Sequence, residues 1–163
     1  MTPGRTYRLR IINVSNMASN FVQLRGHEMT VIAVDSVNVE PRTTESIYIT
    51  TAQRYDVLFT AKPTASKNYF FISSLDQSMY GGSFDIAIPN AFGYLTYNPD
   101  LPLPAVYEPT SFDPIDDFSL VPYDKEPLLG PVSQTIVINM VFQNDAYGIN
   151  RSVAEAQHLD TIY

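Results

Sequence analysis

The stretch YITTAQRYDVLFTAK, from Tyr48 to Lys62, is the part of the chain that decides its fold. Within it, Arg54 to Ala61 places Tyr55, Val57 and Phe59 at alternate positions, between residues that are mostly polar. Alternation with a period of two is typical of a strand that buries one face. We therefore predict a half-buried β-strand here, entered through the polar turn that precedes it.

Segments of the same character recur through the first 98 residues, and turn signals such as Arg25-Gly26 and Lys62-Pro63 separate them. Several short strands at this spacing predict an all-β sandwich or barrel. The other predicted strands are Tyr7–Val14, Phe21–Arg25, Met29–Val34, Ser46–Thr50, Tyr69–Ser73 and Phe92–Tyr97.

The composition changes after Asn98, because eight of the twelve prolines lie between Pro99 and Pro131. Proline fixes φ and removes a backbone donor, so this segment cannot be a central strand. We predict a long Pro-rich connection over the domain surface, in which the many acidic residues form a solvated face and helix caps. Beyond it, we predict a strand over Thr135–Phe142 and a weak helix over Ser152–Leu159.

The charge and composition exclude several classes of protein. The formal net charge is −7, which disfavours nucleic acid as a partner because polyphosphate binding needs a basic surface. Hydrophobic residues make up 45% of the chain, as in a globular protein. No apolar run is long enough for a membrane helix, so we predict no membrane segment in this chain.

The sequence contains few of the residues that bind transition metals. The chain has no cysteine, and its two histidines, His27 and His158, lie far apart. A blue-copper site needs a thiolate and two imidazoles, and the usual zinc sites need a comparable cluster. We therefore predict no copper site and no other cofactor in this chain. His27 is interpreted as a hydrogen-bonded histidine of a turn or strand edge, and Arg54 as a structural clamp on a carboxylate or on loop carbonyls.

Two aspartates and two tyrosines are expected near one loop mouth: Asp76, Asp85, Tyr80 and Tyr94. Carboxylates there could attract a cation such as Fe(II). Alternatively, Asp76 merely caps a turn, and both interpretations stay open.

Two sites fit the N-glycosylation pattern. The sequon at Asn13 is expected to be structural, whereas Asn150 is the better candidate if the chain is secreted.

Five segments, in order, resemble the second plastocyanin-like (cupredoxin) domain of fungal multicopper oxidases. They are TYRLRIINVS (6–15), GHEMTVIAVD (26–35), YITTAQRYDVLFTAK (48–62), SKNYFFISSLDQ (66–77) and DDFSLVPYDKEPLLG (116–130). The iron-uptake ferroxidases are the most similar branch, and the laccases come next. The resemblance implies a Greek-key cupredoxin-like domain over residues 1–145, including the connection 99–131, and a non-matching tail over 146–163. His27 and the run Gln53, Arg54 and Tyr55 belong to this motif as structural residues.

Enzymes of that family contain three cupredoxin domains. The resemblance implies that the copper ions belong to the first and third. The second domain walls the substrate pocket of an enzyme that oxidises Fe(II) or phenolic substrates by one electron and reduces O₂ to water. The implied partners are the first and third domains, and an iron permease if the enzyme is ferroxidase-like. The parent family is extracellular or held at the plasma membrane, although this chain carries no targeting signal. We expect the chain to be a piece of a larger gene product, inactive alone.

The resemblance also implies a role for Asp76, which matches the first carboxylate of the family's iron-binding loop. Gly81 stands where the second carboxylate is expected, and Asp85 could replace it. The alternative to an oxidase fragment is a free-standing, non-catalytic β-sandwich that binds a protein or glycan.

Overall fold

The computed structural model describes residues 1–80, 89–109, 111–126, 130–131, 134–144 and 150–159. They form two compact units, Met1–Glu126 and Pro127–Tyr163, which are described separately. The first unit contains eight strands. These are β1 (Thr6–Ile12), β2 (Asn20–Leu24), β3 (Met29–Val34), β4 (Val37–Thr44), β5 (Ser46–Ile49), β6 (Arg54–Thr60), β7 (Tyr69–Leu75) and β8 (Asn90–Leu95). Two short 3₁₀ turns, η1 (Gln77–Tyr80) and η2 (Asp117–Ser119), complete it.

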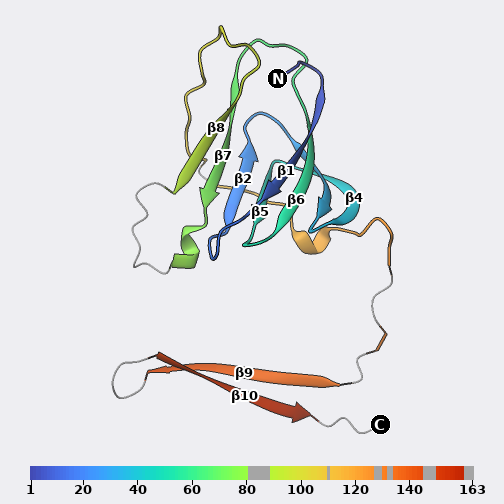
Figure 1. The fold of residues 1–163 in the computed structure, drawn as a ribbon, viewed down its shortest axis with the longest axis vertical. Coiled ribbons are helices and arrows are strands. Elements are labelled where there is room, and N and C mark those ends of the chain that lie inside the picture. The colour runs from blue at the N-terminus through green and yellow to red at the C-terminus, as the bar shows by residue number, and fades with distance from the viewer. Residues whose placement is uncertain (81–88, 110, 127–129, 132–133, 145–149, 160–163) are drawn as a thin grey trace. The chain divides into compact units, whose positions relative to one another are not determined.

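The eight strands build two antiparallel sheets, ordered β1-β6-β3-β4 and β5-β2-β7-β8 (Figure 1). Consecutive strands repeatedly change sheet, as in a Greek-key sandwich. In β6, Tyr55, Val57 and Phe59 point inward and are buried, as the alternation in the sequence predicts. They meet buried side chains of the other sheet, including Val22 and Ile47, in one continuous hydrophobic core. The predicted all-β, cupredoxin-like fold is confirmed.

The Pro-rich connection, Pro99–Glu126, lies against the sandwich and is called the strap below. Two of its aromatic side chains pack on the outer face of the sheet that contains β7. Tyr107 packs on Phe70 at a centroid distance of 5.4 Å, and Phe112 stacks on Phe21 at 5.0 Å. The strap therefore shields apolar residues that would be exposed to solvent in a sandwich of two sheets alone.

The strap also covers one edge of each sheet. Beside β4, the Tyr123 N–H donates to the Asn38 carbonyl at 2.8 Å, and Val121 accepts from the Glu40 N–H at 2.8 Å. Beside β5, the Ile115 N–H donates to the Ser46 carbonyl at 3.3 Å. Prolines are tolerated in this position because the strap needs only scattered backbone hydrogen bonds, not a continuous ladder.

Asn68, which is only 3% exposed, holds the beginning of the strap. Its Oδ1 accepts hydrogen bonds from the backbone N–H groups of Tyr97 (2.8 Å) and Asn98 (3.0 Å). Its Nδ2 faces the carbonyls of Asn98, Leu101 and Pro102 at 2.9, 3.1 and 3.3 Å. One buried amide thus satisfies the backbone of a segment that has no regular structure of its own.

The second unit contains an antiparallel hairpin, β9 (Thr135–Asn144) and β10 (Asn150–Leu159). The predicted strand over Thr135–Phe142 is confirmed, whereas the helix predicted over Ser152–Leu159 is wrong. That segment pairs residue by residue with β9, from Asn150 opposite Asn144 to Leu159 opposite Thr135. Pairing with a strong neighbouring strand overrides its weak helical preference. The predicted domain boundary at residue 145 falls outside the described residues and stays a prediction.

Two further details differ from the sequence-based expectation. The sequence pattern gave no indication of β4, a strand that contains Pro41. In addition, β1 ends at Ile12, so Asn13 and Val14 follow the strand and do not continue it. Among the described residues, no helix is long and apolar enough to cross a membrane.

Candidate functional site

Asp76 directly follows β7, where the chain turns into η1. Its backbone N–H donates to the Ser19 carbonyl at 2.9 Å, which fixes the start of the loop. Its Oδ1 accepts from the Ser78 N–H (3.0 Å) and the Ser78 hydroxyl (2.6 Å), and its Oδ2 accepts from the Tyr48 hydroxyl (2.7 Å). Three donors therefore hold one carboxylate in a defined orientation.

These contacts decide the charge of Asp76. Partial burial disfavours the charged form, but the hydrogen bonds from the Ser78 hydroxyl, the Tyr48 hydroxyl and the Ser78 N–H outweigh burial and lower its pKa. The pKa of Tyr48 shifts in the opposite direction. Although a hydrogen bond with Ser19 lowers the pKa of Tyr48, burial and the neighbouring Asp76 carboxylate raise it overall. At neutral pH the site is thus a carboxylate beside a neutral phenol.

Asp76 lies at a shallow hollow of about 500 Å³ at one end of the sandwich. The walls are mostly apolar and come from both the sheet and the strap. They include Phe21 and Tyr48 from β2 and β5, and Ile115 and Phe118 from the strap. Phe118 is fully exposed, at 100% of its reference area. The arrangement presents one ionised carboxylate beside an open aromatic surface.

The strap is fastened beside this hollow by Asp117, in what we call the clasp (Gln53, Tyr55 and Asp117). The Tyr55 hydroxyl donates to Asp117 Oδ1, and Gln53 Nε2 donates to Oδ2 at 2.9 Å. Burial first, and then the hydrogen bond and charge of Asp117, raise the pKa of Tyr55. Asp116 caps η2 by accepting from the Phe118 N–H at 3.0 Å, so some of the acidic residues of the connection are indeed caps.

His27 lies in the turn before β3 and is only 6% exposed. Its Nδ1 is 3.1 Å from the Arg25 carbonyl, which can only accept, so Nδ1 carries the proton. Its Nε2 therefore accepts from the Tyr97 hydroxyl at 2.6 Å, and that hydroxyl accepts from the Lys62 N–H at 2.7 Å. Burial is the largest cause of a lowered pKa for His27, and the charge of Lys62 adds to it. Both ring nitrogens are used within the fold.

Arg54 begins β6, and its Nη1 donates to the Ala52 carbonyl at 2.6 Å. Its backbone N–H donates to Asp35 Oδ1 at 2.8 Å, which ties β6 to the turn between β3 and β4. Ala52, Asp35 and Ser36 all have positive φ, so these hydrogen bonds hold two tight turns in an uncommon conformation. Gln53 and Tyr55 thus share Asp117, whereas Arg54 contacts the two turns.

The structure does not bring Tyr94 beside Asp76. Tyr94 lies in β8 opposite Phe70 and is not among the described residues that line the hollow. Asp85 and Gly81 lie outside the described residues. Asn150 is the first residue of β10, and its glycosylation stays a prediction. Asn13 is buried, and its Nδ2 donates to the carbonyls of Ala18 (2.7 Å) and Ile49 (3.1 Å).

Sequence reasoning missed Tyr48, Ser78 and Asp117. Ser78 could have been found, because an aspartate two residues before a serine often forms a local side-chain-to-backbone turn. No local signal marks Tyr48 or Asp117, since their partners lie 28 and 62 residues away along the chain.

The two-sheet fold and its strand order define a cupredoxin-like domain, and comparison with known proteins identifies its family. The family model described as "Cu-oxidase: Multicopper oxidase" matches residues 1–100. This chain belongs to the multicopper oxidase family.

Curated relatives cover most of this chain. "Iron transport multicopper oxidase FET3" of Candida albicans is 39% identical over 150 residues, which make up 91% of this chain and 24% of that protein. "Iron transport multicopper oxidase fio1" of Schizosaccharomyces pombe is 38% identical over 122 residues, or 75% of this chain and 20% of the relative. The chain therefore spans between a fifth and a quarter of the length of these relatives.

Solved structures agree with this assignment. The crystal structure of Fet3p, described as a multicopper oxidase that functions in iron import, matches with a TM-score of 0.84 at 35% identity. That match covers 94% of this chain and 29% of the other. A laccase from Botrytis aclada matches with a TM-score of 0.65 at 28% identity, over 96% of this chain and 28% of the other.

Copper is implied by the family, but the residues present do not fit a copper site. The chain has no cysteine to supply a thiolate, and its two histidines cannot form a cluster. His27 has both nitrogens engaged, and His158 belongs to the separate hairpin unit. Among the described residues, no three potential ligand side chains gather as a metal site.

Proposed function

We propose that this chain is the copper-free middle domain of a multicopper oxidase whose substrate is Fe(II), and that it forms one wall of the substrate pocket. In the parent enzyme, each Fe(II) would lose one electron and O₂ would be reduced to water. The copper ions would belong to the first and third cupredoxin domains. The observation that carries this proposal is the ionised Asp76 carboxylate at the rim of the hollow.

The relatives support iron as the substrate. The curated proteins from Candida albicans and Schizosaccharomyces pombe are both named iron transport multicopper oxidases. A laccase also matches, so a phenolic substrate is the alternative within the same family. Gly81 stands where the resemblance expects a second acid, which weakens the case for iron, and Asp85 stays a candidate for that role.

The hydrogen bonds of Asp76 limit what it can offer a metal ion. A carboxylate has about four acceptor positions, two on each oxygen. The two donors on Ser78 use both positions of Oδ1, and Tyr48 uses one position of Oδ2. Counting only donors among the described residues, one position remains, so Asp76 can supply a single oxygen ligand. A domain that contributes one ligand suits a wall of a shared site, in which neighbouring domains supply the rest.

The wider setting follows from the same proposal. The cupredoxin domain would extend over residues 1–145, and residues 146–163 would be a non-matching tail. Its partners would be the first and third domains of the oxidase, and an iron permease if the enzyme is a ferroxidase. The parent enzyme would act outside the cell or at the plasma membrane.

Anaerobic titration of the chain with Fe(II), followed by two-dimensional amide NMR, tests the role of Asp76. A paramagnetic ion bound at one carboxylate should broaden the amide signals of Ser19, Asp76 and Ser78 first, with weak affinity. Asp76→Asn should abolish this selective broadening, because the amide is neutral but keeps the shape of the side chain. Asp100→Asn, which changes an exposed aspartate of the strap, is the matched control. Equal broadening in both variants would exclude Asp76 as the iron ligand.

A free-standing interaction module is the second candidate, and the full exposure of Phe118 favours it. Isolated exposed apolar residues are ordinary. Phe118, however, lies in η2, which is capped by Asp116 and held by the clasp, and it is beside an apolar hollow. Sequencing the transcript beyond both ends distinguishes the candidates. Histidine-rich copper motifs encoded upstream and downstream would support the oxidase domain. Untranslated sequence on both sides would support the module.

A further inference from the structure

β1 differs from the other edge of its sheet. The sheet order places β1 and β4 at the two edges, and the strap covers β4 through Val121 and Tyr123. Among the described residues of the first unit, no strand pairs with the outer side of β1. An uncovered edge presents backbone N–H and C=O groups that can accept a further strand.

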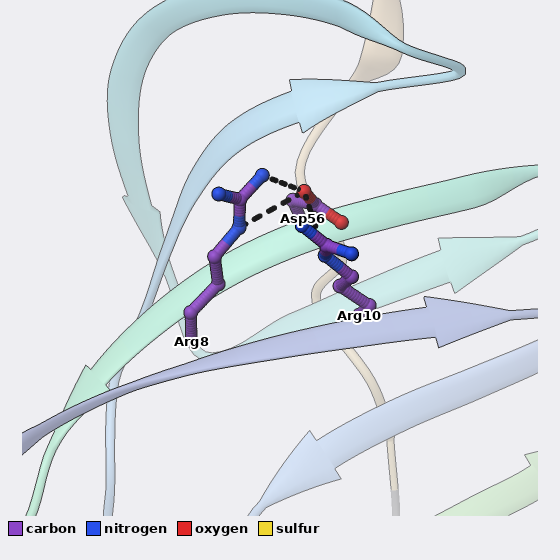
Figure 2. A network of polar contacts seen from close by, with 3 residues as sticks. All are labelled: Arg8, Arg10 and Asp56. Atoms are coloured by element: carbon purple, nitrogen blue, oxygen red, sulfur yellow. Dashed lines mark hydrogen bonds and ion pairs between the residues drawn. The ribbon is translucent and has the colours of Figure 1, made fainter.

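On the outer face of β1, two arginines share a single aspartate (Figure 2). Arg8 and Arg10 both point at one oxygen of Asp56, which lies on the neighbouring strand β6. Arg8 donates to Asp56 Oδ2 through Nε at 3.0 Å and also through Nη2. Arg10 Nε lies 3.8 Å from the same oxygen, which is an ion pair but too long for a hydrogen bond. With 70% of its side chain exposed, Arg10 keeps its donors available.

The charge count of this region indicates what it can bind. A hollow of about 360 Å³ is lined by Arg8, Arg10 and Arg54 and by the carboxylates of Asp35 and Asp56. Three cations against two anions leave one positive charge in excess, in a chain whose net charge is −7. A monoanion such as a carboxylate would balance that excess. A dianion such as phosphate would meet repulsion from the two aspartates.

We propose that the free edge of β1 binds an extended acidic segment of a partner protein by strand addition, with a carboxylate of that segment on Arg10. An exposed ion pair alone is weak, so backbone hydrogen bonds along the edge supply the remaining affinity. In an added strand, alternate side chains fall on the outer face beside Arg8 and Arg10. A second copy of this chain fits poorly, because antiparallel pairing of two β1 edges would bring arginines together. This proposal is independent of the oxidase role.

The test uses the full chain and a short fluorescent peptide in which glutamate alternates with valine. Fluorescence anisotropy should show binding of this peptide and little binding of the matched lysine peptide. Arg10→Gln should weaken binding by about threefold to fivefold, in line with the loss of one exposed ion pair. Asp56→Asn should strengthen binding by a similar factor, because it removes the internal carboxylate that competes for both arginines.

Arg42→Gln is the matched control, since Arg42 is exposed on β4 at the opposite edge of the same sheet. It should leave binding unchanged. Hydrogen exchange supplies the second readout, because strand addition should slow exchange of amides within Thr6–Ile12. The proposal is overturned if the lysine peptide binds equally well, if Asp56→Asn does not strengthen binding, or if exchange slows at β4 instead.

Discussion

The substitution Asn68→Ala should lower the free energy of unfolding of the first unit by about 3–4 kcal/mol. Asn68 Oδ1 accepts two backbone hydrogen bonds, and Nδ2 faces three carbonyls but has only two hydrogens. The side chain therefore makes four hydrogen bonds, each contributing about 1 kcal/mol. Alanine removes all four and leaves the N–H groups of Tyr97 and Asn98 without this acceptor.

Urea denaturation followed by tyrosine fluorescence measures this loss, since the chain has eleven tyrosines and no tryptophan. Asn38→Ala is the matched control, because the Asn38 side chain is exposed. It should change stability by no more than about 0.5 kcal/mol. A loss below about 1 kcal/mol for Asn68→Ala would refute the reasoning, because the start of the strap would then be held without the Asn68 amide.

Four further outcomes are expected. The lowered pKa of His27 means that the unfolded chain takes up the proton first as pH falls below about 6.5, so stability declines there. His27→Gln should remove that part of the pH dependence in denaturation curves. Tyr55→Phe should cost about 1.5–3 kcal/mol through the lost hydrogen bond to Asp117, whereas Tyr123→Phe, at a residue 70% exposed, should be neutral in the same assay. Added Cu(II) should give no intense copper–thiolate absorption band, because the chain has no cysteine. On secretion from a eukaryotic host, mass spectrometry of glycopeptides should find Asn13 unmodified, because its side-chain nitrogen is buried and already donates twice.

Most strands could be predicted because their pattern is local. In β6, apolar residues at alternate positions match the buried face, and β3 is the apolar run Met29–Val34 that the sequence predicts. The pattern does not predict β4, because this strand contains Pro41 and most of its side chains are exposed. Such a sequence is compatible with an edge strand, and the strap supplies only isolated hydrogen bonds beside it.

The candidate site could be predicted only in part. Its motif predicts Asp76 as a candidate, and Ser78 lies within the same turn. The clasp and the Tyr48 contact depend on how distant segments fold together, which no spacing in the sequence encodes. The helix predicted over Ser152–Leu159 failed for a related reason, because its hydrogen-bonding partner is another strand.

The way the strap is attached has a mechanical consequence. Its contacts with β4 lie at Val121, Tyr123 and Lys125, close to the end of the first unit, and the clasp at Asp117 comes next. A pulling force applied at Glu126 would load these contacts one after another, starting with the Lys125–Glu40 ion pair. Bonds broken in sequence resist less force than bonds loaded together. The strap should therefore peel away before the sandwich yields, uncovering the aromatic face of the sheet while the core is still folded.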